Sequence, residues 1–161
     1  MTSGDHLPAL AASRYRQQES VVLAVRRRGH PPRVVRYICS PPERVDGHVA
    51  LSRWAAGRGW LVDPQTYTDR CEPGPVGERT ELRIALDRVM AGHADGLLAP
   101  AFEHISPDLG EYGDQLHQVR AHDRFIALVL PEIPRGAPQG MHGWKAPQEV
   151  FGTEPRSAGA R

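Results

Sequence analysis

The sequence has little lysine, few aromatic residues and few cysteines. Lys145 is the single lysine among 20 basic residues, and Phe, Trp and Tyr together make up 6% of the chain. A GC-rich codon bias explains this preference for arginine more simply than phosphate binding does. Cys39 and Cys71 are too few for a disulfide framework or a cysteine-based metal site. We therefore expect a reduced, cytoplasmic protein.

Long apolar runs and a strong net charge are also missing. No segment approaches the roughly 20 apolar residues of a membrane-spanning helix, so we expect no membrane association. The formal net charge is +1, which gives no overall signal for nucleic acid or membrane surfaces. The sequence has no Gly-rich phosphate loop and no paired carboxylates, and its histidines match no zinc-binding spacing. We expect neither a metal nor a cofactor.

Proline and glycine are abundant, with 15 and 16 residues, and they help to divide the chain. We expect an N-terminal extension over residues 1–32, of which residues 1–19 are polar, small and without a structural signal. Whether residues 19–32 form a helix or a strand stays open. Residues 33–132 predict one domain with a real core. Residues 133–161 lack periodicity and predict a disordered Pro/Gly-rich tail.

Apolar strands alternate with amphipathic helices in residues 33–132. Arg33–Cys39 is β-branched and nearly continuously apolar, as a central parallel strand is. Pro64 removes a ladder donor and predicts that its strand lies at an edge. Residues 80–91 form the clearest helix, which Thr80 can cap and Gly92 can end. Further helices are expected over 46–58 and 108–122, and further strands within 94–102 and 124–130.

This alternation predicts a three-layer α/β fold with a mainly parallel sheet of four to five strands. We expect the strand order 2-1-3-4, with Arg33–Cys39 as strand one. Ligands of such sheets bind at the carboxyl ends of the strands, and Ser40 lies at that end of strand one. Ser40 is therefore placed as a nucleophile would be. A serine that ends the strand before Pro41 and Pro42, bonding a nearby backbone amide, also explains the pattern, and we favour that interpretation.

The order of the motifs carries more information than the fold class. A strand ending in serine is followed by "LSRWAAGRGW", "YTDR", "ERTELRIALDRVMAGHADGLLAP", "FEHIS" and "FIALVLPE". Together they resemble the catalytic domain of the serine recombinases (resolvases and invertases) over about residues 33–132. The resemblance implies a serine hydroxyl that attacks a DNA phosphodiester without a metal ion. Arginines would neutralise the negative charge of the transition state.

The resemblance assigns roles to five residues. Ser40 matches the nucleophile, and Arg79 matches an arginine at the end of a mobile loop, where it would stabilise the phosphate charge. Arg36, Arg70 and His104 are candidates for contacts with DNA phosphates. Arg36 reaches the signature position only if a one-residue gap is allowed, and Arg70 lies with Asp69 in the loop that the resemblance places beside the serine.

Other positions depart from the family pattern. Ile38 stands where the Arg-x-Ser signature has arginine, Glu103-His104 replaces an Asp-Arg pair, and Pro107 replaces a further arginine. Removing one preorganised charge stabiliser costs about 10² to 10³ in rate. The family's long dimer helix and its C-terminal DNA-reading module also have no counterpart in the sequence.

These departures predict a catalytically degenerate resolvase-like domain with a DNA-associated or regulatory role. Its partners would be DNA, bound weakly through phosphates, and a second copy or an intact recombinase relative. Two alternatives stay open. In the first, the chain is a catalytically active, site-specific DNA recombinase that uses Ser40 as its nucleophile. In the second, it is an unrelated small α/β protein that binds a nucleotide or phosphate ligand at Ser40.

Overall fold

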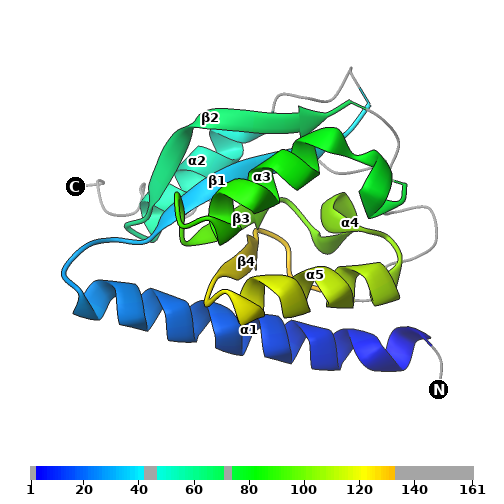
Figure 1. Ribbon diagram of the computed structural model, residues 1–161, viewed down its shortest axis with the longest axis horizontal. Coiled ribbons are helices and arrows are strands. Elements are labelled where there is room, and N and C mark those ends of the chain that lie inside the picture. The colour runs from blue at the N-terminus through cyan, green and yellow to red at the C-terminus, as the bar shows by residue number, and fades with distance from the viewer. Residues whose placement is uncertain (1–2, 42–46, 71–73, 133–161) are drawn as a thin grey trace, which may run out of the picture.

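The computed structural model describes residues 3–41, 47–70 and 74–132, and the side chains from His6 onward. The tail expected over residues 133–161 lies outside the described residues. The elements in chain order are α1 (Ser3–Arg27), β1 (Arg33–Cys39), α2 (His48–Gly57), β2 (Leu61–Asp69), η2 (Val76–Glu78), α3 (Thr80–Met90), β3 (Gly96–Ala99), α4 (Phe102–Ile105), α5 (Leu109–Ala121) and β4 (Phe125–Leu128). Figure 1 shows their arrangement.

The four strands form one parallel sheet in the order β2-β1-β3-β4. This confirms the predicted α/β class, the strand order and the central position of Arg33–Cys39. The strand that contains Pro64 lies at an edge, as its missing backbone donor requires. Gly92, with a φ of +95°, ends α3 in the left-handed conformation that glycine adopts without strain.

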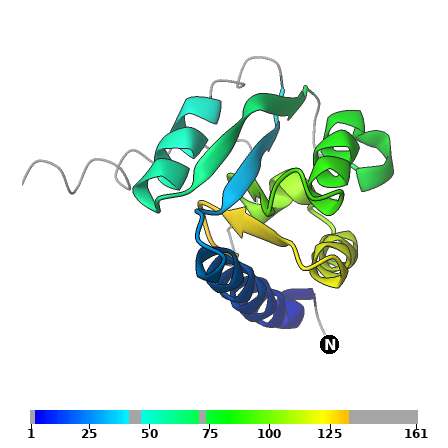
Figure 2. The same ribbon diagram turned by 60° about the vertical axis from the view of Figure 1, so that its left-hand side comes forward.

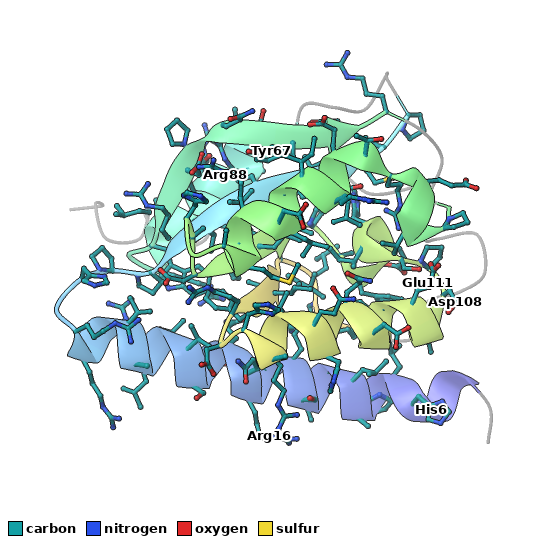
Figure 3. All side chains as sticks on the ribbon, viewed as in Figure 1. His6, Arg16, Tyr67, Arg88, Asp108 and Glu111 are labelled. Atoms are coloured by element: carbon teal, nitrogen blue, oxygen red, sulfur yellow. The ribbon has the colours of Figure 1, made fainter. Side chains whose placement is uncertain are left out.

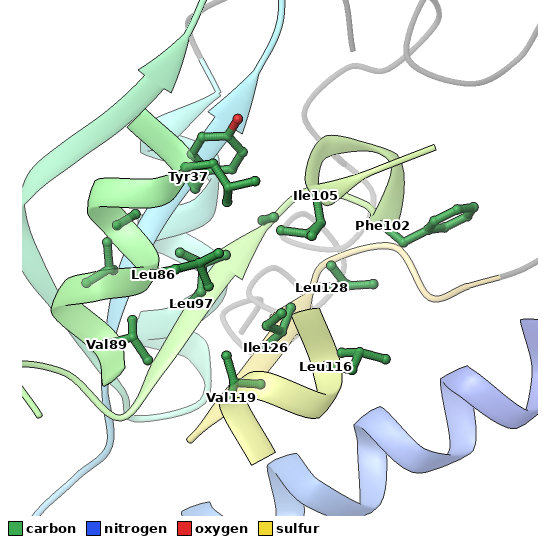
Figure 4. Close-up of a cluster of buried hydrophobic side chains, with 14 of the residues drawn as sticks. Tyr37, Leu86, Val89, Leu97, Phe102, Ile105, Leu116, Val119, Ile126 and Leu128 are labelled. Carbon is green, nitrogen blue, oxygen red and sulfur yellow. The ribbon is translucent and has the colours of Figure 1, made fainter. Parts of the chain in front are cut away.

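Helices cover both faces of the sheet, which makes the three layers. Figure 2 shows α2 on one side and α3 and α5 on the other. Side chains of β1 alternate between the two layers: Val35, Tyr37 and Cys39 join the core under α3 and α5, whereas Val34 and Ile38 join the core under α2. Figure 4 shows the first of these cores.

Gly96 leaves room for the ring of Phe125 from the neighbouring strand β4. A Cβ atom at this position would lie 2.5 Å from the ring of Phe125, which is the residue that pairs with Gly96 across the two strands. Phe125 itself is fully buried and packs edge-on against Trp60. Any side chain at position 96 would displace this ring.

The N-terminal segment differs from the expectation. We predicted that residues 1–19 lack structure, but residues 3–27 form the long helix α1. In Figure 1, α1 runs beside β4 and α5. Its Leu7 contributes to the core under α5, and its Val21 and Val25 contribute to the core under α2. The helix therefore spans the β4 edge of the sheet and closes both cores.

Two polar side chains of α1 bond to the outer edge of β4. Gln17 donates from Nε2 to the carbonyl oxygen of Arg124 at 3.0 Å, and Arg14 donates from Nη1 to the carbonyl oxygen of Ile126 at 3.3 Å. These carbonyls point away from β3, because residues of alternate parity make the ladder. Thus α1 satisfies backbone groups that would otherwise form an open sheet edge.

Candidate active site

Ser40 follows the last residue of β1 at the carboxyl end of the sheet. Its backbone N–H donates to the carbonyl oxygen of Asp69 at 3.0 Å, which extends the pairing of β1 with β2 by one residue. The residue is only 6% exposed. Ser40 therefore lies where the sequence predicts it, at the carboxyl end of β1, and its backbone N–H is used in the pairing of β1 with β2.

The short helix α4 brings His104 to the same place. The backbone N–H of Cys39 donates to Nδ1 of His104 at 3.1 Å, so the imidazole lies against the residue that precedes Ser40. An imidazole nitrogen that accepts a hydrogen bond carries no proton, and the ring proton of this neutral tautomer is on Nε2. In this arrangement His104 supplies an N–H donor and not a positive charge.

Arg79 is almost completely buried, with 1% of its surface exposed. Its Nη1 donates to the carbonyl oxygen of His104, its Nη2 donates to that of Ile105, and the Tyr37 hydroxyl lies 3.5 Å from Nη1. The guanidinium therefore fixes the C-terminal end of α4 from the protein interior. It satisfies carbonyls that a four-residue helix leaves without internal partners.

Asp69 caps helix α3, a role that the sequence assigned to Thr80. Its two carboxylate oxygens accept from the backbone N–H groups of Glu81 and Leu82 at 3.1 and 3.0 Å, and from the Tyr37 hydroxyl at 2.9 Å. Burial raises the pKa of Tyr37 above its ordinary value, so its hydroxyl keeps the proton that it donates. The capping residue lies at the end of β2, 11 residues before α3 begins, so no capping motif at the start of the helix predicts it.

Arg36 stabilises an irregularity in β2. Val34 pairs with Val62 but Arg36 pairs with Thr66, so β2 carries extra residues around Pro64. The guanidinium of Arg36 donates to the carbonyl oxygens of Asp63 and Pro64 at 3.0 and 3.2 Å and to Ser52 Oγ at 2.7 Å. Burial lowers the pKa of Arg36. Its donors serve carbonyls that the bulge removes from the ladder.

The structure therefore brings some of the candidates together and separates others. His104 and Arg79 lie together beside β1: His104 bonds to the backbone of Cys39, the residue before Ser40, and Arg79 bonds to the carbonyl oxygen of His104. Arg36 lies four residues before Ser40, which is about 13 Å along a strand. Arg70 is exposed, and its side chain has the solvent access that a phosphate contact needs.

Ile38, at the position of the signature arginine, lies two residues before Ser40 on the same face of β1. It is fully buried, and it packs in the apolar core with Leu51, Trp54 and Leu98. An arginine here would have to leave this core to approach a phosphate at Ser40. Position 38 therefore holds a residue of the apolar core and not a side chain that could bind a phosphate.

Comparison with solved structures identifies the fold. The N-terminal catalytic domain of TP901-1 integrase superposes with a TM-score of 0.53 at 17% identity, over 60% of this chain and 76% of that one. The C-terminal catalytic domain of ISC1926 TnpA, an IS607-like serine recombinase, gives a TM-score of 0.54 at 16% identity, over 61% and 70%. The fold is that of a serine recombinase catalytic domain. At the level of sequence, no protein-family model and no curated protein matches the chain.

This resemblance to serine recombinases was predicted from the order of the sequence motifs, and the fold confirms it. The shared part corresponds in extent to the predicted domain of about 100 residues. Within the described residues, no helix is both long and apolar enough to cross a membrane. The same residues contain no group of three or more His, Cys, Asp and Glu side chains that could hold a metal ion.

His48 is a titratable group of this resolvase-like fold to which no sequence motif assigns a role. It begins α2, and its Nε2 lies 2.7 Å from Oγ1 of Thr68 on β2. Burial, together with the nearby charge of Arg36, lowers the pKa of His48 to about 4. The neutral imidazole therefore joins α2 to the edge strand on the same face of β1 that leads to Ser40.

We expect this buried imidazole to make stability depend on pH. In the unfolded chain His48 titrates near its ordinary pKa of about 6.5, so the unfolded state binds more protons between that value and about 4. The contribution of neutral His48 to the free energy of unfolding is then fully present above pH 6.5, and it is lost as the pH falls toward 4. With allowance for solvent screening the loss should be about 1 to 2 kcal/mol. Urea unfolding of the parent and of His48→Gln at pH 7 and 4.5 measures it.

The control for this experiment is His93→Gln, because His93 is exposed. The parent and His93→Gln should lose the same amount of stability on acidification, and His48→Gln should lose less. Equal losses for all three proteins would show that His48 is not the group responsible.

Proposed function

We propose that this chain is a resolvase-like domain that has lost recombinase chemistry and acts through binding. The proposal rests mainly on the surroundings of Arg79. A transition-state stabiliser must direct its donors at the place where charge develops. Both terminal nitrogens of Arg79 are instead bonded to carbonyl oxygens of His104 and Ile105 in the interior. To contact a phosphate, Arg79 would have to break these bonds and leave two buried carbonyls without donors.

The other positions of the site support the same proposal. Ile38 belongs to the apolar core, Arg36 is bonded to the carbonyls of the β2 bulge, and His104 accepts the N–H of Cys39. Within the described residues, Ser40 would thus attack a phosphodiester with few free cations beside it. A serine hydroxyl is a weak nucleophile unless a base or a charge cluster activates it. Among the described residues, the two arginines proposed for this chemistry, Arg36 and Arg79, are instead bonded to backbone carbonyls, which supports the loss of catalysis.

The proposal predicts that the protein forms no covalent bond to DNA. A suicide duplex, nicked so that the leaving strand diffuses away, traps any phosphoserine link because the reverse attack is prevented. We expect no adduct on denaturing gels between pH 7 and 9, and the same result for Ser40→Ala. A serine recombinase with intact catalytic residues, treated identically, is the positive control.

An adduct that survives denaturation and disappears in Ser40→Ala would establish the alternative, an active recombinase. Ser40→Ala must fold for this comparison. Because Ser40 holds its place through the backbone N–H, we expect its stability to change by no more than about 1 kcal/mol.

The binding role predicts weak DNA affinity with little sequence preference. With a net charge of +1 and Arg70 as the exposed arginine among the described candidates, affinity would rest on a small number of phosphate contacts. We expect a Kd on the order of 10⁻⁴ to 10⁻⁶ M at physiological salt, typical of non-specific binding. Filter binding at several salt concentrations gives the affinity and the number of contacts.

Arg70→Ala provides the matched variant, because Arg70 is exposed and its side chain makes no salt bridge with another described residue. If Arg70 contacts a phosphate, the slope of log K against log salt should decrease in magnitude by about 1 for every sequence tested. Nanomolar affinity for one particular sequence would contradict the proposal, since it would require contacts with base edges in addition to those with phosphates.

A further inference from the structure

Helix α1 carries a second apolar stripe on the side that faces away from the sheet. Ala12, Tyr15, Arg16, Glu19, Val22 and Leu23 line a shallow groove along it. Tyr15 is 54% exposed and Leu23 is 51% exposed, the former more than any other large aromatic residue described. Figure 3 shows Arg16 pointing away from the body of the domain. The inner side of α1 already closes both cores, and its buried core residues are not among those that line the outer stripe.

We propose that the outer stripe of α1 is an interface for a second copy of this chain, with the two α1 helices antiparallel. The stripe is self-complementary in that orientation. If the contact is centred between Gln17 and Gln18, Ala12 of each copy lies across from Leu23 of the other. In the same register Arg16 of each copy lies across from Glu19 of the other. A two-fold axis makes each of these pairs occur twice.

Size and charge both favour this register. Ala12 leaves room for Leu23 of the second copy, which is how one side chain fits into the surface of a facing helix. Tyr15 and Val22 lie on one flank of the stripe and extend the apolar contact. Within the part of the chain that the structure describes, neither Arg16 nor Glu19 takes part in a salt bridge. A parallel pair would instead place Arg16 against Arg16 and Glu19 against Glu19.

The length of the stripe sets the expected strength of the dimer. Residues 12–23 cover about 17 Å of helix at 1.5 Å per residue. A contact of this length buries less surface than the roughly 1,200 to 2,000 Å² of a standard interface. We therefore expect a reversible dimer with a Kd on the order of 10 to 100 µM. Such a dimer goes beyond the proposed binding role, and it does not depend on whether Ser40 is active.

Sedimentation equilibrium of the full chain, from 5 to about 500 µM in steps around that expected Kd, tests the proposal. Leu23→Glu should weaken dimerisation at least about tenfold, because it places a charge against Ala12 of the second copy. Ile84→Glu is the matched control: Ile84 is a 42% exposed apolar residue on α3, and its replacement should leave the Kd unchanged. Circular dichroism confirms that both variants fold.

Charge reversal tests the register separately from the apolar contact. Arg16→Glu and Glu19→Arg should each weaken the dimer, since each brings two like charges together twice. The double variant Arg16→Glu/Glu19→Arg restores opposite charges across the interface and should recover the parental affinity. A merely structural role of either residue within α1 predicts no such recovery.

Cysteine pairs give a direct measure of the antiparallel arrangement. In a Cys71→Ser background, Ala12→Cys combined with Leu23→Cys should form an interchain disulfide on mild oxidation, and either single change should not. A chain that stays monomeric over the whole range, or a dimer that ignores both Leu23→Glu and the charge reversals, would overturn the proposal. So would dimerisation only after removal of residues 133–161, which would show that the chain's own tail occupies the stripe.

Discussion

Arg79→Met should destabilise the domain by about 2 to 4 kcal/mol. The substitution removes the donors of the buried carbonyls of His104 and Ile105, and each buried acceptor left without a partner costs about 1 to 3 kcal/mol. The loss is partly offset, because methionine buries no charge and no N–H: Arg79 Nε has no hydrogen-bond partner among the described residues. Urea denaturation at pH 7 measures the change.

Arg83→Met is the control for Arg79→Met. Arg83 lies one turn later and is exposed on α3, so its replacement should change stability by no more than about 0.5 kcal/mol. Arg79→Lys keeps a charge, but an ammonium group cannot reproduce the planar fork that serves two carbonyls, and it should be destabilised as well. If Arg79→Met folds as stably as the parent and loses DNA affinity, Arg79 is a phosphate ligand and our assignment of it to the interior is wrong.

This experiment separates two roles that the sequence alone could not. The resemblance to serine recombinases placed an arginine at the start of α3, and the structure has Arg79 there. Which way its guanidinium points depends on α4, whose carbonyls are 25 and 26 residues away. A motif specifies the position of a residue along the chain, and the partner that captures its side chain is known only when the fold is.

The sheet could be predicted because its signals are local. Continuous β-branched segments, Pro64 and the glycines that end helices determine where the elements begin and end, and right-handed crossovers leave few orders for four parallel strands. The place of Ser40 follows from that topology. The cap of α3 by Asp69 and the bonds from Arg36 to the β2 bulge do not, because they join residues that only the finished sheet brings together.

Helix α1 was missed for a more specific reason. The residues that face the domain recur at helical spacing: Leu7, Leu10, Arg14, Gln18, Val21 and Val25. Arg14 and Gln18 occupy the middle of this stripe, so the apolar periodicity is interrupted where a helix signal should be strongest. Their burial is possible only because Glu132, 118 residues after Arg14, provides a partner. No local pattern predicts such a pair.

The pair of Arg14 and Glu132 is the second site where we expect a large effect. Arg14 donates from Nε and Nη2 to the two carboxylate oxygens of Glu132 at 2.6 and 3.1 Å, and Arg14 Nη1 also bonds to Gln18 at 3.0 Å. The hydroxyl of Tyr112 on α5 donates to the same carboxylate. Burial, and then the negative charge of Glu132, raise the pKa of Tyr112, which keeps this donor protonated. The cluster joins α1, α5 and the segment after β4.

Glu132→Ala should therefore destabilise the protein by about 3 to 5 kcal/mol, because it leaves the guanidinium of Arg14 buried without its counter-ion. Because Arg14 anchors α1 to the β4 edge, the helix should also become accessible, and trypsin should cleave within residues 1–32 at least about tenfold faster, in line with a free-energy loss of more than 1.4 kcal/mol. Thermal and urea unfolding measure the first effect, and mass spectrometry of the digest measures the second. Arg120→Met, an exposed arginine on α5, should change neither.

The double variant Arg14→Met/Glu132→Leu distinguishes a requirement for charge from a requirement for a filled interior. Replacing a buried ion pair by apolar side chains of similar size is often neutral or stabilising, so the double variant should recover most of the stability that Glu132→Ala loses. The recovery should be incomplete, since the carbonyl of Ile126 and the hydroxyl of Tyr112 lose the hydrogen bonds that Arg14 and Glu132 make to them. If the double variant is less stable than Glu132→Ala, the polar cluster itself holds α1 on the sheet edge, and the apolar contacts of Leu7, Val21 and Val25 are not enough to keep it there.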